Sequence, residues 1–178
     1  MKWNADHTTT VDKIMINKTY PITEKLLKNG LNASLKLMEL LTREADSLKK
    51  NADSTAISII AAHKKETVTQ LDQFSKQLTQ VLATEKLQMT PSGVSEYFKK
   101  AETVKLDTSN SSSTWKEIIS ISKQSRILNE RNGASINLLA QHTQRSLQIL
   151  KGKSQQATTY GPDGSTYSER LSHSLVSV

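Results

Sequence analysis

The side chains that could carry acid–base, metal or nucleophilic chemistry are scattered along this chain and form no established catalytic motif. The histidines are His7, His63, His142 and His173. They make no HxxxH or HExxH pattern, so polar positions on long helices explain them better than a metal site does. Glu44 and Asp46 are two residues apart, a spacing that does not bring two carboxylates together on a helix. The serines lack a nucleophile elbow, and no glycine-rich phosphate loop is present.

The absence of cysteine narrows the chemistry further. It excludes disulfides, thiolate zinc sites, iron–sulfur clusters and cysteine nucleophiles. We therefore expect no enzyme activity, no metal, no cofactor and no small-molecule substrate. A binding or structural role is left.

The charge of the chain bears on its partners. Its 178 residues include 24 Lys and Arg against 17 Asp and Glu, a net charge of +7. Such a surplus occurs in proteins with nucleic-acid or acidic partners. The basic residues are spread along the chain, and their densest stretch, residues 116–153, has only Trp115 beside it for base stacking. A solvated helix face is the simpler interpretation. A basic coiled-coil scaffold or nucleic-acid-binding protein stands as the alternative function.

Nothing in the chain suggests membrane insertion. The first residues, 1–8, contain no apolar signal-peptide core, and the longest nearly apolar run, residues 56–62, is far shorter than a membrane span. We expect a soluble, cytoplasmic protein.

Few glycines and prolines interrupt the chain, so we expect long helices. These helices must position whatever surface the protein uses. A first helix is predicted over about 23–49, with Pro21 just before it and Gly30 inside it, where glycine costs about 1 kcal/mol relative to alanine. A second is predicted over about 54–88, and the short connection between them predicts an antiparallel hairpin. The apolar face of the first helix comprises Leu27, Leu31, Leu35, Met38, Leu41, Ala45 and Leu48. The corresponding stripe of the second comprises Ile57, Ile60, Lys64, Val68, Leu71, Phe74, Leu78 and Leu82.

Further along the chain, the sequence signals the starts of two more helices. Thr90 and Pro91 predict a short helix. Residues 107–113 contain no apolar side chain and are predicted as a mobile loop. Thr114 and Glu117 would then form a capping box at the start of a third long helix. Its helically spaced seam consists of Ile118, Ile121, Ser125, Leu128, Asn132, Ile136, Leu139, Thr143, Leu147 and Leu150.

The predicted fold class is all-α. It comprises the antiparallel hairpin, the third long helix, a short extra helix and a flexible C-terminal tail, arranged as an elongated coiled-coil-like bundle. Residues 1–20 receive no assignment, 21–152 form the helical bundle and 153–178 the tail. Within the tail, residues 160–164 predict a turn, and the spacing of Tyr167, Leu171 and Leu175 predicts a short amphipathic helix that orders on a partner.

Four segments together resemble the FlgN family of flagellar export chaperones. They read WKEI at 115–118, LNERNGA at 128–134, LQILKG at 147–152 and YGPDG at 160–164. Upstream, LLTREADSL at 40–48 and HKKE at 63–66 are similar to the first hairpin of that family. The resemblance covers roughly residues 23–165, and its C-terminal segments are the more specific ones.

The resemblance implies a cytoplasmic chaperone. Its partners would be the C-terminal helices of the hook-associated (hook–filament junction) proteins, which it keeps from assembling early, and the cytoplasmic domain of the type III export gate. The cargo-binding region of the family corresponds here to the end of the third helix and the tail. The implied cargo-binding residues are Leu147, Leu150, Tyr167, Leu171, Leu175 and Val176. Tyr160 and Gly161 are the implied contacts with the export gate.

Three alternatives stay open at this point. Leu147 and Leu150 can pack inside the bundle instead of binding cargo, and packing is the simpler interpretation. Asn132 and Ser125 can set the register of the third helix, as polar core residues do, or lie at the edge of the seam. The chain can also associate with a second copy through the same seams.

Overall fold

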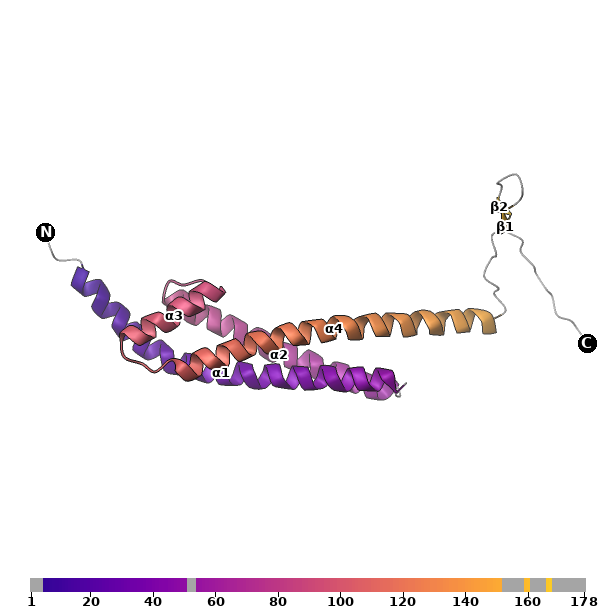
Figure 1. Cartoon of the computed structure of the whole chain (residues 1–178), viewed down its shortest axis with the longest axis horizontal. Helices are drawn as coiled ribbons and strands as arrows, with labels where there is room; N and C mark the ends of the chain where they lie inside the picture. Colours follow the sequence, from indigo (N-terminus) through magenta and orange to yellow (C-terminus); the bar gives the residue numbers. More distant parts are fainter. Residues whose placement is uncertain (1–4, 51–53, 152–158, 161–165, 168–178) are drawn as a thin grey trace, which may run out of the picture. The chain divides into compact units, whose positions relative to one another are not determined.

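The structure is a computed structural model that describes residues 5–50, 54–151, 159–160 and 166–167 and, within α1, side chains from Met15 onward. Four helices, α1 (Ala5–Lys49), α2 (Ser54–Thr84), α3 (Pro91–Thr103) and α4 (Ser109–Leu150), precede two short strands, β1 (Thr159–Tyr160) and β2 (Thr166–Tyr167) (Figure 1). The predicted all-α class is confirmed. By its contacts the chain divides into two units, Met1–Gly133 and Ala134–Val178.

Helices α1 and α2 form the predicted hairpin and lie side by side (Figure 1). The predicted start of the first helix was wrong, because α1 begins at Ala5 and contains Pro21. Proline inside a helix costs about 3 kcal/mol or more. Ile16, Tyr20 and Thr23 nevertheless continue the buried face of α1 at helical spacing, with exposures of 2%, 4% and 1%. We attribute the continuation of the helix to this burial.

Gly30 of α1 lies against the ring of Phe74 from α2. A Cβ atom at this position would stand only 2.7–2.9 Å from ring atoms of Phe74. The aromatic ring therefore occupies the space that a side chain would need. This contact explains a glycine in the middle of a helix, where its flexibility is otherwise unfavourable.

Helix α2 is shorter than predicted, so a longer connection leads to α3. Helix α2 ends at Thr84 rather than near Gln88, and Lys86 adopts a left-handed conformation with φ of 60°. The backbone N–H of Leu87 turns back to the carbonyl oxygen of Leu82 at 2.8 Å, which closes the helix end. The predicted start of α3 is confirmed, since the side chain of Thr90 accepts a hydrogen bond from the N–H of Gly93 at 3.0 Å.

The predicted loop at 107–113 was wrong, and so was the capping box. Helix α4 begins at Ser109, and the hydroxyl of Thr114 donates to the carbonyl oxygen of Asn110 inside it. A carboxylate oxygen of Asp107 accepts the backbone N–H of Ser109 at 3.0 Å. Ser111 is buried, with its hydroxyl oxygen 3.0 Å from that of Tyr20. A polar segment is ordered here because its hydrogen-bond partners come from within the protein.

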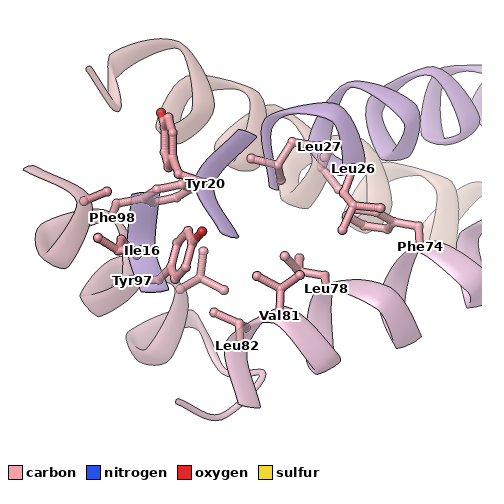
Figure 2. Packing of buried hydrophobic residues seen from close by; sticks show 13 residues of the cluster. Ile16, Tyr20, Leu26, Leu27, Phe74, Leu78, Val81, Leu82, Tyr97 and Phe98 are labelled. Atoms are coloured by element: carbon pink, nitrogen blue, oxygen red, sulfur yellow. The ribbon is translucent and has the colours of Figure 1, made fainter. Parts of the chain in front are cut away.

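The apolar core of the first unit lies where α1, α2 and α3 meet the start of α4. It comprises Ile16, Tyr20, Leu26, Leu27, Phe74, Leu78, Val81, Leu82, Val94, Tyr97, Phe98, Ala101 and Ile118 (Figure 2). Tyr97 is almost fully buried, and its hydroxyl lies 2.8 Å from the Thr23 hydroxyl and 3.1 Å from that of Thr19. Burial raises the pKa of the Tyr97 phenol above its usual value of 10.0.

Candidate partner-binding surface on α4

Burial of the α4 seam changes sharply along the helix. Ile118 and Ile121 are 3% and 9% exposed, and Asn132 is still only 4% exposed. From Ala134 to Leu150 every residue is exposed. The first part of the predicted seam is therefore a core face, and the second part is an apolar surface within the described residues.

A polar cluster of buried Glu44 and Asn132 and half-buried Lys64 holds α4 where its buried part ends. Glu44 is 2% exposed, and Lys64 Nζ donates to both of its carboxylate oxygens, at 2.7 and 2.8 Å. Asn132 Nδ2 donates to Glu44 Oε2 at 2.9 Å and to the carbonyl oxygen of Leu41 at 2.8 Å. One carboxylate thus joins α1, α2 and α4. This geometry supports register setting for Asn132 over the edge position.

The start of α4 is held by a second contact with α1. Tyr20 Oη donates to the carbonyl oxygen of Asp107 at 2.6 Å and lies 3.0 Å from Ser111 Oγ. The pairs Tyr20–Ser111 and Leu41–Asn132 are both separated by 91 residues. Helices α1 and α4 therefore keep one parallel register between the two contacts, a span of three heptads.

The exposed part of α4 carries two groups of apolar side chains. The first, which we call the seam stripe, consists of Ile136, Leu139, Leu147 and Leu150, with exposures of 39%, 41%, 48% and 82%. The second group, Leu138 and Ile149, is 58% and 74% exposed. It lies roughly 130° round the helix from the seam stripe, at 100° per residue. The sequence interpretation missed the second group, although its spacing of eleven residues is three helical turns.

The structure places only some of the implied site residues. Leu147 and Leu150 are on the seam stripe of α4, where their side chains are 48% and 82% exposed. Tyr160 and Tyr167 lie on adjacent antiparallel strands, where Tyr160 pairs with Thr166 and Tyr167 with Thr159. Tyr167 therefore does not begin a helix. The remaining implied site residues, Gly161, Leu171, Leu175 and Val176, lie outside the described residues.

The described residues contain no group of three or more His, Asp or Glu that could hold a metal ion. Within the same residues, no helix is long and apolar enough to cross a membrane.

The fold and this surface define a class of protein: a helical protein whose last long helix, α4, carries an exposed apolar face after its buried part. The comparison with known families makes this specific. The family model for FlgN protein matches residues 19–168, and the chain belongs to this family of flagellar export chaperones. The chain has no significant match among curated proteins or among solved structures.

Proposed function

We propose that this protein is a cytoplasmic chaperone that binds the C-terminal helices of the flagellar hook-associated proteins. It prevents their premature assembly and delivers them to the type III export apparatus. The observation that supports this proposal best is the seam stripe of α4. An amphipathic helix of the cargo would lay its own apolar side chains against Ile136, Leu139, Leu147 and Leu150, which are spaced as helix anchors are.

Apolar burial would supply most of the affinity. Burial stabilises by about 25 cal/mol per Å² of apolar surface, so each leucine that becomes fully covered contributes about 1.5–3 kcal/mol. The entropic cost of association offsets a large part of this gain. The complex is therefore reversible, as export requires. It also withstands a doubling of the salt concentration, because screening acts on charges and not on apolar contacts.

Residues after the end of α4 supply further contacts in this proposal. Tyr167, Leu171, Leu175 and Val176 extend the cargo surface. Tyr160 and Gly161 contact the cytoplasmic domain of the export gate. These assignments rest on the family resemblance.

The test is a calorimetric titration of the full chain with C-terminal helical segments of the two hook–filament junction proteins. Leu147→Ser should weaken binding about tenfold or more, as loss of one buried anchor does. The matched control is Ile59→Ser on α2, which removes another exposed apolar side chain, 53% exposed, and should leave binding unchanged.

A chain ending at Gly152 separates the helix from the residues that follow it. Retained binding places the cargo surface on α4, and lost binding places it in residues 153–178. Absence of binding by the full chain to either segment would contradict the proposed function. Dissociation on doubling the salt would contradict its apolar basis.

A further inference from the structure

The second apolar group of α4 lies on a stripe of mixed chemistry. Leu138, His142, Arg145 and Ile149 follow one another at spacings of four, three and four residues, so they share one face of the helix. We call this face the basic stripe. Its apolar ends, Leu138 and Ile149, are more exposed than any residue of the seam stripe except Leu150. Its centre carries the guanidinium of Arg145.

Helix α4 has no carboxylate in the part that carries the basic stripe. The last acidic residue of the helix is Glu130, and its Oε1 already accepts a hydrogen bond from Arg126 Nε at 3.0 Å. From residue 131 to residue 151 the chain has basic side chains and no Asp or Glu. This half of α4 therefore presents apolar and cationic groups together.

We propose that the basic stripe binds an acidic amphipathic helix of the protein partner. Leucine-like side chains of that helix cover Leu138 and Ile149, and its carboxylates face Arg145. This inference rests on the proposed function and adds a second contact face to it. The partner then contacts α4 with two helical surfaces, an apolar one on the seam stripe and an acidic amphipathic one on the basic stripe.

Charge and geometry favour this occupant over two others. A second copy that paired through the same stripe would bring Arg145 against another basic stripe, with no carboxylate of that stripe to pair with it. A membrane surface suits a helix with one continuous apolar face. Here the two apolar groups are roughly 130° apart, at 100° per residue. Two helical surfaces of a protein fit such an arrangement.

The probes are two synthetic amphipathic helices with identical leucine positions, one with glutamates along its flank and the other with glutamines in their place. Fluorescence anisotropy measures their binding to the full chain. We expect the glutamate peptide to bind about 3–10-fold more tightly, since solvent-exposed charge pairs contribute modestly and add specificity. Arg145→Glu should abolish this preference and favour a lysine version of the peptide. Lys123→Glu, the same charge change on the buried half of α4, should leave the preference intact.

Equal affinity for the two peptides, or binding of neither, overturns this inference. So does concentration-dependent dimerisation that Arg145→Glu abolishes, or binding to vesicles of anionic lipid that displaces the glutamate peptide. The proposed function is judged separately, by the junction-protein segments and the Leu147→Ser variant.

Discussion

At the scale of single residues, the carboxylate of Glu44 determines how α4 sits on the hairpin. It is buried, paired with Lys64 and bonded to Asn132. An ion pair in such a place stabilises little against an apolar replacement, but the loss of one partner leaves the other charge buried. Specific register is therefore the larger contribution of this cluster.

Glu44→Ala should lower the free energy of unfolding by about 3 kcal/mol, because the Lys64 ammonium loses its carboxylate and the Asn132 amide loses one of its two acceptors. Urea denaturation followed by circular dichroism measures the change. Glu39→Ala is the control, since the Glu39–Arg43 pair is 68% and 62% exposed. It should change the stability by less than about 0.5 kcal/mol. Equal effects of the two substitutions would show that the cluster does not hold α4.

Two glycines in helices should respond to alanine in opposite directions. Gly30→Ala places a methyl group against the Phe74 ring and should destabilise the protein despite the better helix propensity of alanine. At Gly133 a Cβ would meet nothing within 4 Å, so Gly133→Ala should stabilise by about 0.5–1 kcal/mol. Thermal unfolding compares the two variants. Adding Phe74→Leu to Gly30→Ala should recover part of the loss, and absence of recovery would contradict the steric explanation.

At the scale of elements, the first turn of α4 depends on a tyrosine from α1. The hydroxyl of Tyr20 bonds the carbonyl oxygen of Asp107 and lies beside Ser111, so it orders a segment that lacks apolar side chains. The core underneath supplies the remaining support through Ile118.

Tyr20→Phe should keep the packing of the ring and remove both hydroxyl contacts, at a cost of about 1–2 kcal/mol. The loss of stability should be confined to the first turns of α4. Hydrogen exchange should accelerate in the amides of residues 109–115 and stay unchanged in those of α2 around Leu71. Uniform acceleration along the chain would instead indicate a loss of global stability only.

At the scale of the whole molecule, the core cluster lies entirely in the first unit, and Tyr97 is among its most buried side chains. Burial raises the pKa of Tyr97, and it raises that of Tyr20 as well. Above pH 10 the folded chain therefore retains phenol protons that the unfolded chain has lost. Stability due to these groups is complete below about pH 10 and decreases as the pH rises further.

Tyr97→Phe should make this alkaline decrease shallower, because one of the two buried phenols no longer titrates. At neutral pH the variant should be less stable by about 1 kcal/mol through loss of the bonds to Thr23 and Thr19. Urea denaturation at several pH values between 8 and 11 measures both effects. An unchanged slope above pH 10 would show that Tyr97 is not protected from titration.

The sequence by itself determined the features that depend on neighbours a few residues away. The all-α class, the hairpin, the Thr90 cap and the seam of α4 follow from helical spacing and local capping chemistry. The family resemblance is confirmed as well.

Only the tertiary structure decided the features whose partners lie far along the chain. Pro21 is inside α1 because the residues around it are buried, and Ser111 is helical because Tyr20, 91 residues away, reaches it. Asn132 and Leu139 occupy equivalent seam positions, yet one is buried against Glu44 and the other is exposed. Periodicity shows which residues share a face of a helix. Burial and bonding partners depend on what covers that face.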